Sequence, residues 1–423
     1  MRMRQDQENE VAVLRVKAEQ GDAEAQFNLG AAFAYGQGVP QDYVQAVAWT
    51  RKAADQGYAD AQYNLGVAYD RGQGLLQDEA QAVEWYRQAA EQGYLNAQFN
   101  LGVAYAYGRG VEKNEALGAV WIEAAADGGN AEAQLMLSRM WFSGVGVQKD
   151  SAQGLFWCQR AVEQGSSGAQ CMLGVLYFNG QHVAMDVALA LAWWLRAAEQ
   201  GNLDAHLNLG MMYETGRGVP QDDAQAVAWY RKAAEQGNAK AQCNLGGAYA
   251  TGQGVPQDDA QAVGWYRKAA DMGYAAAQSN LGAMYAKGRG VPQNDAQAVA
   301  WYHKAAEQGD AVAQSNLGAM YENGRSVRQN DTKAVAWYRQ AADQGDAGGQ
   351  FNLGVMYVNG RGVPQDDAQA VAWFCKAADQ GHAHAKFNLA VMYANGRWVP
   401  QDETQALVWL REAAEMGPER GKQ

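Results

Sequence analysis

A period of 36 residues constrains this chain more than any other feature of its sequence. Twelve glycines recur at that spacing from Gly21 to Gly417 and bound eleven units, and a second glycine series runs once per unit from Gly36 to Gly396. Self-similarity at one fixed period predicts a solenoid in which each unit packs on its neighbours. One tryptophan never varies between units: Trp49, Trp85, Trp121, Trp157, Trp193, Trp229, Trp265, Trp301, Trp337, Trp373 and Trp409.

Each unit is predicted to form two helices. In the first unit, apolar residues at helical spacing predict helix A over about 23–35. Gly36 then supplies the left-handed turn that ends a helix. Asp42 is expected to cap helix B, which runs to about Gln56, and eight units carry Gln three residues after this position. That pairing predicts a capping box, in which the Gln side chain also bonds back to the cap residue.

Small residues at fixed places predict close helix packing. Leu29 and Ala53 recur in all eleven units, and Gly30 recurs in nine, with Ser138 and Ala390 as the exceptions. A glycine inside a helix costs about 1 kcal/mol relative to alanine. Its recurrence therefore implies that the partner helix approaches closely at this point. The tryptophans could form a stacking platform, but their invariance favours a packing role, because packing repeats from unit to unit.

The two ends of the chain differ from the repeats. Residues 1–20 are predicted to form a half-repeat capping helix, because residues 5–20 align with helix B of a unit. Residues 21–417 hold the eleven repeats, and 418–423 form a short polar tail. No capping helix follows the last unit, so Leu407 and Leu410 are expected to be partly exposed. Either the chain was cut from a longer protein or this end meets a partner.

The repeat resembles the Sel-1-like family, a relative of tetratricopeptide repeats. The resemblance covers residues 21 to 417, and the first unit, AEAQFNLGAAFAYGQGVPQDYVQAVAWTRKAADQG, matches the family pattern throughout. It implies an all-α, right-handed superhelical solenoid with helix A lining the concave side. It also implies a scaffold or adaptor role, often in bacterial signalling, envelope or host-interaction pathways.

Composition excludes several classes of partner. The formal net charge of −12 argues against nucleic acid and against an anionic membrane surface. No segment is long and apolar enough to span a bilayer, and the N-terminus lacks the apolar region of a signal peptide. The expected location is cytoplasmic, or periplasmic or secreted if a leader has been removed. The four cysteines have neither metal-ligand nor redox spacing, so no metal or cofactor is expected.

An asparagine on helix A is the best candidate for partner binding. Tetratricopeptide relatives use asparagines at this position to hold a peptide backbone, and an amide both donates and accepts hydrogen bonds. The alternative is that these amides tie neighbouring repeats together. Both roles can hold at once. The series is Asn28, Asn64, Asn100, Asn208, Asn244, Asn280, Asn316, Asn352 and Asn388.

Aromatic residues beside this ladder suggest a docking patch in the first three units. Phe27, Tyr63 and Phe99 each precede a ladder asparagine, and Tyr35, Arg71 and Tyr107 follow two turns later on the same face. Aromatic side chains anchor many interfaces. The alternative is ordinary tolerated variation.

Units four and five, about residues 130 to 200, diverge most. Met136 and Met172 replace the ladder asparagine there, and QHVAMD at 181–186 replaces the usual connection. Methionine suits adaptable binding surfaces, so this region could be a specialised site, a hinge or the product of drift.

Nothing in the sequence supports catalysis. Some cysteine-rich members of the resembled family have been described as β-lactamases, but this chain lacks their Ser-x-x-Lys and Lys-Thr-Gly motifs and their paired cysteines. We therefore expect a protein-interaction scaffold that binds proteins or extended peptides and not an enzyme. A module that self-assembles through the solenoid ends, giving a homo-oligomer through the C-terminal end, is the alternative, and a β-lactamase-like hydrolase is a remote one.

Overall fold

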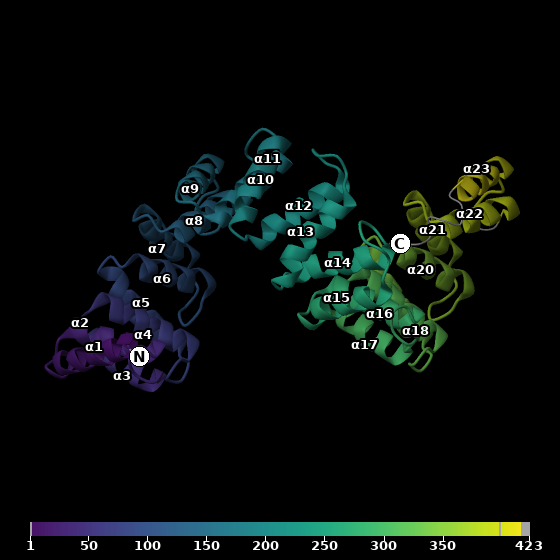
Figure 1. The fold of residues 1–423 in the computed structure, drawn as a ribbon. Helices are drawn as coiled ribbons and strands as arrows, with labels where there is room; N and C mark the ends of the chain where they lie inside the picture. Colours follow the sequence, from purple (N-terminus) through teal and green to yellow (C-terminus); the bar gives the residue numbers. More distant parts are fainter. Residues whose placement is uncertain (1, 397–398, 416–423) are drawn as a thin grey trace. The chain divides into compact units, whose positions relative to one another are not determined.

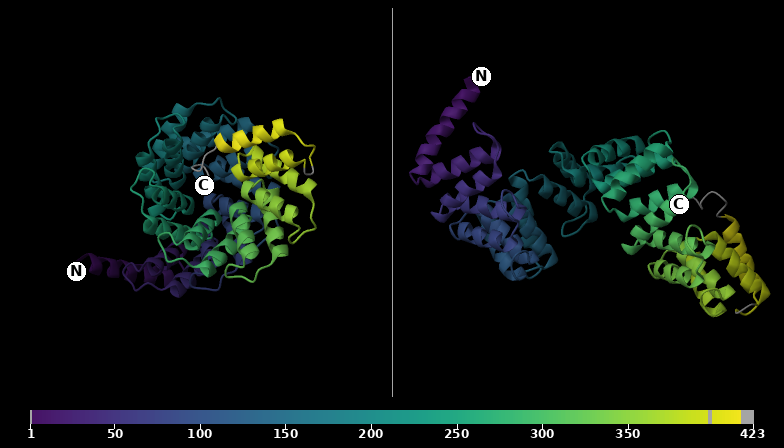
Figure 2. Two further views of the ribbon diagram at one scale, coloured as in Figure 1. Left: turned by 90° about the vertical axis from the view of Figure 1, so that its right-hand side faces the viewer. Right: turned by 90° about the horizontal axis from the view of Figure 1, so that it is seen from below.

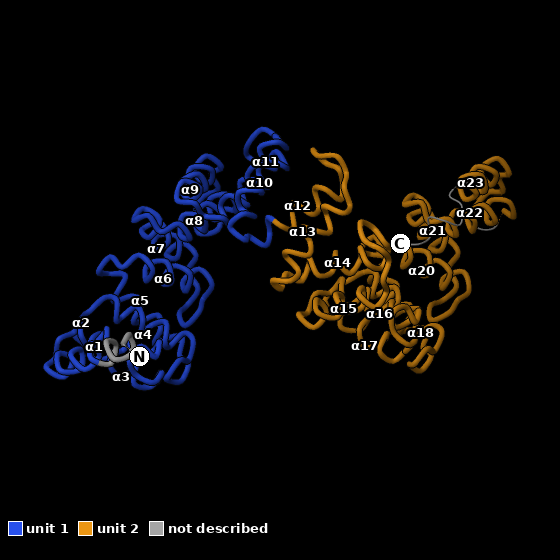
Figure 3. Tube along the Cα trace, in the orientation of Figure 1, with its two compact units in different colours: residues 1–205 blue, residues 206–423 orange. Residues whose placement is uncertain are grey.

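The computed structural model describes residues 2–396 and 399–415, and within these ranges the chain is all helix with no strand (Figure 1). It divides into two compact units, residues 1–205 and 206–423 (Figure 3). From here on, "unit" means one of these two parts, and each 36-residue segment is called a repeat. The first unit contains α1 (Arg2–Glu19), α2 (Ala23–Tyr35), α3 (Tyr43–Asp55), α4 (Ala59–Arg71), α5 (Glu79–Glu91), α6 (Leu95–Tyr107), α7 (Glu115–Asp127), α8 (Ala131–Ser143), α9 (Ser151–Glu163), α10 (Ser167–Asn179) and α11 (Val187–Glu199).

The division falls within α12 (Leu203–Thr215). The second unit continues with α13 (Asp223–Glu235), α14 (Ala239–Thr251), α15 (Asp259–Asp271), α16 (Ala275–Lys287), α17 (Asp295–Glu307), α18 (Ala311–Asn323), α19 (Asp331–Asp343), α20 (Ala347–Asn359), α21 (Asp367–Asp379), α22 (Ala383–Asn395) and α23 (Glu403–Glu415). From α2 onward the even-numbered helices are helix A and the odd-numbered ones helix B. Within each unit the hairpins follow one another in chain order (Figure 2).

Local signals set the helix ends as expected, with one correction. Gly36 ends α2 in the left-handed conformation (φ 68°, ψ 33°), and its N–H donates to the carbonyl of Ala32. The Asp42 carboxylate accepts from the backbone N–H of Gln45 at 3.0 Å, as predicted. The capping box is wrong, because the Asp42 N–H donates to the carbonyl of Phe33 at 2.9 Å. Helix A of the same hairpin thus takes the bond that the Gln45 side chain was expected to make.

The helix-A glycine makes room for one particular side chain. A Cβ on Gly66 would lie 2.6 Å from the ring of Tyr86 and 3.2 Å from the carbonyl oxygen of Ala82, both on the partner helix. The predicted close approach is therefore confirmed, and the ring one residue after the invariant tryptophan is its cause. Tyr86 is only 4% exposed.

Where the glycine is replaced, the facing residue is no ring. Ser138 faces Gly154, whose carbonyl accepts a 2.6 Å bond from the Ser138 hydroxyl, and the residue at the ring position is Cys158. Ala390 belongs to the repeat that carries Leu410 at the ring position. Seven of the nine helix-A glycines face a buried ring, while Gly30 faces Thr50 and Gly102 faces Ile122.

The invariant tryptophans do pack, but they are not the most buried residues. Most are partly buried and lie against a core cluster; Trp265, for example, packs beside Leu207, Tyr230 and Leu245. The Lys268 ammonium lies 3.9 Å from the centroid of the Trp265 ring and covers it from the solvent side. Five other tryptophans carry a cation three residues later in the same way. This arrangement supports the packing interpretation.

The divergent connection at 181–186 contains a strained residue. Positions equivalent to Gly38 adopt positive φ, and only His182 (φ 63°) and Ser326 (φ 54°) do so without being glycine among the described residues. Such a conformation is costly for a residue with a Cβ. The His182 ring stacks on Phe142 with centroids 4.5 Å apart, and its Nδ1 lies 2.7 Å from the Ser151 hydroxyl.

The helices at either end also show their packing. Val11 and Ala18 of α1 are buried in one cluster with Leu29 of α2. On α23, Leu407 is 66% exposed and Leu410 is 40% exposed. The predicted tail 418–423 lies outside the described residues. Among those residues, none of the helices combines the length and apolar character that crossing a bilayer requires.

Candidate functional site

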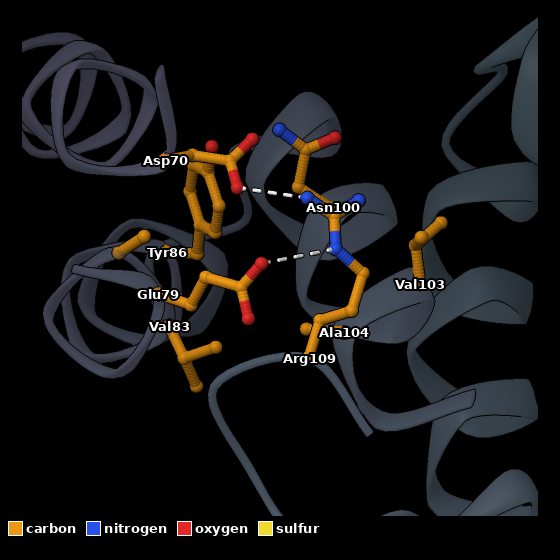
Figure 4. Close-up of a pocket in the computed structure, with 9 residues that line it drawn as sticks. Asp70, Glu79, Val83, Tyr86, Asn100, Val103, Ala104 and Arg109 are labelled. Atoms are coloured by element: carbon orange, nitrogen blue, oxygen red, sulfur yellow. Dashed lines mark hydrogen bonds and ion pairs between the residues drawn. The ribbon is translucent and has the colours of Figure 1, made fainter. Parts of the chain in front are cut away.

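Three cavities occupy the same place in successive repeat junctions of the first unit. We name them the 1/2, 2/3 and 3/4 sites after the repeats that they join. All nine residues that line the 2/3 site have counterparts 36 residues earlier in the 1/2 site, and six have counterparts 36 residues later in the 3/4 site. Their volumes are about 160, 70 and 570 Å³ in chain order. The lining of the 2/3 site is Asp70, Glu79, Ala82, Val83, Tyr86, Asn100, Val103, Ala104 and Arg109 (Figure 4).

Three kinds of segment build each site. Helix A of the later repeat contributes the ladder position, which is Asn64, Asn100 or Met136. Helix B of the earlier repeat contributes its first residue, and the connection of the later repeat contributes the residue after its helix-ending glycine. The latter two are Tyr43 and Gln73 in the 1/2 site, Glu79 and Arg109 in the 2/3 site, and Glu115 and Val145 in the 3/4 site.

At three junctions of the second unit an arginine clamp occupies the equivalent place. Arg325 holds Asp295, the first residue of α17, through Nε and a terminal nitrogen at 3.0 and 2.6 Å. The same guanidinium donates to the carbonyl of Ala286 at 3.2 Å. Arg289 and Arg361 clamp Asp259 and Asp331 in the same way. A bidentate arginine of this kind fixes the connection of one repeat to helix B of the repeat before it.

The clamp shifts the ionisation of its carboxylates. The hydrogen bonds from Arg289 lower the pKa of Asp259, and those from Arg325 lower the pKa of Asp295. In the first unit, by contrast, Gln73 and Val145 stand where the arginine would be, and Tyr43 stands where the 1/2 site would need the carboxylate. The 1/2 site therefore lacks both halves of the clamp, and the 3/4 site lacks its arginine.

The 2/3 site keeps the arginine but is not filled by it. Arg109 bonds Asp70 at 3.0 Å and lies 3.7 Å from Glu79, so two carboxylates share one guanidinium. The hydroxyl of Tyr86 is buried beside the Asn100 amide and makes no hydrogen bond to a carboxylate among the described residues. Figure 4 shows these groups around one space.

Two equivalent tyrosines of the second unit donate to a glutamate. The hydroxyl of Tyr230 donates to Glu214 at 2.6 Å, and that of Tyr338 donates to Glu322 at 2.7 Å. Asp70 occupies the position of these glutamates and is one methylene shorter. Asp70 pairs with Arg109 and does not bond Tyr86.

The 3/4 site is larger and mostly apolar. Its lining includes Phe99, Leu135, Met136, Met140 and Val145. Its four charged residues are two basic and two acidic, and Lys113 and Glu115 pair with each other at 2.7 Å. Tyr107, which is 66% exposed, stands at the rim. A cavity of this size and character accommodates a large apolar side chain.

The ladder asparagines fall into two groups. Asn28 and Asn64 are exposed and make no hydrogen bond to another described residue. The Asn280 amide instead reaches Cys243 of the preceding repeat at 3.7 Å. Burial raises the pKa of Tyr63, and a hydrogen bond from Asn100 opposes that shift. Inter-repeat bonding, the alternative role, therefore accounts for some positions, while partner binding by the ladder stays a prediction.

The predicted aromatic patch is also divided. Phe27 packs on Tyr58 with ring centroids 5.4 Å apart, so it serves the contact between repeats. Tyr35, Asn64 and Arg71 line the 1/2 site, whereas Asn28 and Phe27 line none of the cavities described here. A fourth cavity, of about 390 Å³, includes Tyr63, Phe99 and Asn100. The remaining ladder asparagines lie in the second unit: Asn208, Asn244, Asn280, Asn316, Asn352 and Asn388.

Sequence reasoning missed the clamp. Its signal was present, because each clamp arginine follows the glycine of one repeat and its aspartate stands 30 residues earlier in the previous one. The arginine is absent from the 1/2 and 3/4 sites and also from the junctions that carry Gln181 and Gln253, so its absence alone does not mark an open site.

The described residues include no group suited to hold a metal ion. No group of three or more His, Cys, Asp or Glu side chains is placed to hold a metal ion in this part of the chain. Burial raises the pKa of Cys158 and of Cys243 to about 11, so both thiols are protonated at neutral pH. A protonated, buried thiol is a poor nucleophile.

Comparisons with known proteins agree with this architecture. A comparison with curated proteins finds no match. Among solved structures, the chain is similar to a protective antigen of uropathogenic Escherichia coli with an SLR fold, at 40% identity and a TM-score of 0.68, covering 96% of this chain and 86% of that one. It is also similar to a Sel1 repeat protein from Oxalobacter formigenes, at 36% identity and a TM-score of 0.52, covering 73% of this chain and 89% of that one.

The family model described as the Sel1 repeat matches eleven consecutive segments. They are residues 23–58, 59–94, 95–130, 131–166, 167–202, 203–238, 239–274, 275–310, 311–346, 347–382 and 383–418. Each segment begins with the first residue of a helix A. The prediction of an all-α solenoid of eleven 36-residue repeats is thus confirmed, and the chain belongs to the Sel1 repeat family.

Proposed function

We propose that this protein is a non-enzymatic scaffold that binds an extended segment of a partner protein across the 1/2, 2/3 and 3/4 sites. Interaction with other proteins is general for helical repeats of this family. The observation that carries the finer proposal is the open row of equivalent sites in the first unit, where the arginine clamp of the second unit is incomplete.

The linings suit a polypeptide ligand. The exposed amide of Asn64 can donate to and accept from a peptide group of any sequence. Tyr35 and Tyr107 are 75% and 66% exposed, respectively, and stand beside the 1/2 and 3/4 cavities. Exposed aromatic residues next to apolar cavities are typical of interface anchors.

The experiment closes one site with the chain's own device. Val145→Arg, always combined with Glu115→Asp, places an arginine between Gly144 and Gly146 opposite an aspartate and so recreates the Arg–Asp pair of the clamp. Arg325→Val is the matched control, because it removes a clamp in the second unit. Both variants and the wild type are tested on an array of 12-residue peptides of random sequence.

We expect Val145→Arg to lower binding by about tenfold or more, since a filled cavity cannot accept an anchor worth at least 1.4 kcal/mol. Arg325→Val should bind like the wild type. Circular dichroism checks that both remain helical. Equal binding by the wild type and Val145→Arg, or an equal loss in both variants, would overturn the proposal.

A further inference from the structure

Adjacent sites of the row differ sharply in chemistry. The 3/4 site is lined by Phe99, Leu135 and Met136, and its charged residues balance one another. The 2/3 site carries two carboxylates, Asp70 and Glu79, against the single cation of Arg109, so its lining has one net negative charge. One segment lying across both sites therefore meets an apolar cavity beside an acidic one.

The 2/3 site also lacks a hydrogen bond that two junctions of the second unit possess. The buried hydroxyl of Tyr86 makes no bond to a carboxylate among the described residues, whereas the equivalent hydroxyl of Tyr230 donates to Glu214. An unsatisfied buried polar group costs about 1–3 kcal/mol. A ligand that brings a hydrogen-bonding cation to this place meets both the hydroxyl oxygen and the excess carboxylate.

We infer that the bound segment carries a lysine, which enters the 2/3 site, and a large apolar residue, which enters the 3/4 site. This inference rests on the proposed function and assigns the chemical class of the partner. An ammonium group is compact enough for a cavity of about 70 Å³ and donates three hydrogen bonds, which Asp70 and the Tyr86 oxygen accept. The cavity of about 570 Å³ accepts a phenyl, indole or methionine side chain.

The geometry of the repeat sets the spacing between the two residues. Equivalent points on consecutive repeats are separated by one repeat step, which is about 10 Å for packed helices. An extended peptide advances about 3.3 Å per residue. The lysine and the apolar residue should therefore be about three positions apart. The acidic character of the whole chain, with a net charge of −12, favours the same basic partner.

The test uses the full chain and the same array of random 12-residue peptides. Peptides bound by the wild type should be enriched in lysine about three positions from Phe, Trp, Leu or Met. Two variants then separate cavity from charge. Asp70→Asn keeps the size and removes the charge. Asp70→Glu keeps the charge but adds the methylene that lets Glu214 reach Tyr230 in the second unit.

Both variants should lower the lysine preference about tenfold, which is the loss of one charged hydrogen bond. Asp127→Asn removes a carboxylate of the same unit outside the four cavities and serves as the control. Met136→Asn should weaken selection of the apolar residue and leave the lysine preference intact. Because Asp70→Glu restores a bond that other repeats possess, its thermal midpoint should not fall.

The possible failures are distinct. Binding that Val145→Arg abolishes, but that shows no lysine preference, would overturn this inference and leave the proposed function standing. A lysine preference that survives in Asp70→Glu would assign it to surface charge and refute insertion into the cavity. Binding that no variant of the three sites alters would overturn both proposals.

Discussion

Two neighbouring glycines in α14 provide a direct test of how this repeat packs. A Cβ added at Gly246 would lie 2.7 Å from Cδ1 and 2.8 Å from Cε1 of the Tyr266 ring. A Cβ added at Gly247 would meet only the Tyr266 hydroxyl, at 3.7 Å, which is an ordinary contact. The variants Gly246→Ala and Gly247→Ala therefore share the helix and the chemical change but differ in the space available.

The magnitudes follow from two opposing effects. Replacing glycine by alanine inside a helix stabilises it by about 1 kcal/mol, and this gain applies to both variants. Inserting a methyl group into a well-packed core costs about 1–3 kcal/mol. Since Tyr266 is only 5% exposed and its ring is rigid, we take the upper part of that range for Gly246. The expected outcome is a net loss of about 1–2 kcal/mol for Gly246→Ala and a gain approaching 1 kcal/mol for Gly247→Ala.

Hydrogen exchange of the α14 and α15 amides is the suitable assay, because repeat arrays open locally and a single unfolding midpoint averages over many repeats. Exchange should become faster in Gly246→Ala and slower in Gly247→Ala. The second change Tyr266→Leu should restore protection to Gly246→Ala, since the chain itself combines Ala390 with Leu410. If Gly246→Ala were as stable as Gly247→Ala, the steric explanation for the glycine series would be refuted.

Three further measurements address the clamp, the thiols and the tryptophans. Because Arg289 lowers the pKa of Asp259, this pair stabilises the fold above the ordinary carboxyl pKa of about 3.9, and the stabilisation is lost as pH falls through the lowered value. The difference in thermal midpoint between wild type and Arg289→Met should therefore shrink from pH 6 to pH 3. A constant difference would contradict a charged clamp. Burial raises the pKa of Cys158 to about 11, so iodoacetamide at pH 8 should leave this residue unlabelled in the native protein and modify it in urea, as followed by mass spectrometry. Lys268→Ala should uncover the Trp265 ring and increase iodide quenching of tryptophan fluorescence relative to Lys240→Ala on α14, while unchanged quenching would show that the ammonium does not shield the ring.

The periodicity was sufficient to predict the helices, their ends and their pairing. Leu29, Gly36 and Asp42 act within one hairpin, through helical spacing, a left-handed turn and a cap, and the structure confirms each of them. The reciprocal half of the capping box failed because its donor, the Asp42 N–H, is taken by Phe33 across the hairpin. Predictions that consider one helix at a time therefore failed only where a carbonyl of the other helix accepts the same N–H.

The candidate site depends on differences between repeats, which a repeat pattern averages out. Asp70 and Glu214 look interchangeable in sequence, yet only the longer glutamate accepts a hydrogen bond from the tyrosine hydroxyl that it faces. Likewise Val145 looks like ordinary variation until Arg325 shows what that position does elsewhere. A short-range pattern dictates how each hairpin forms, because its causes lie within a few residues. The side chains that meet at a junction are 16 to 39 residues apart and their lengths must match in space, and that match is visible only once the helices are packed.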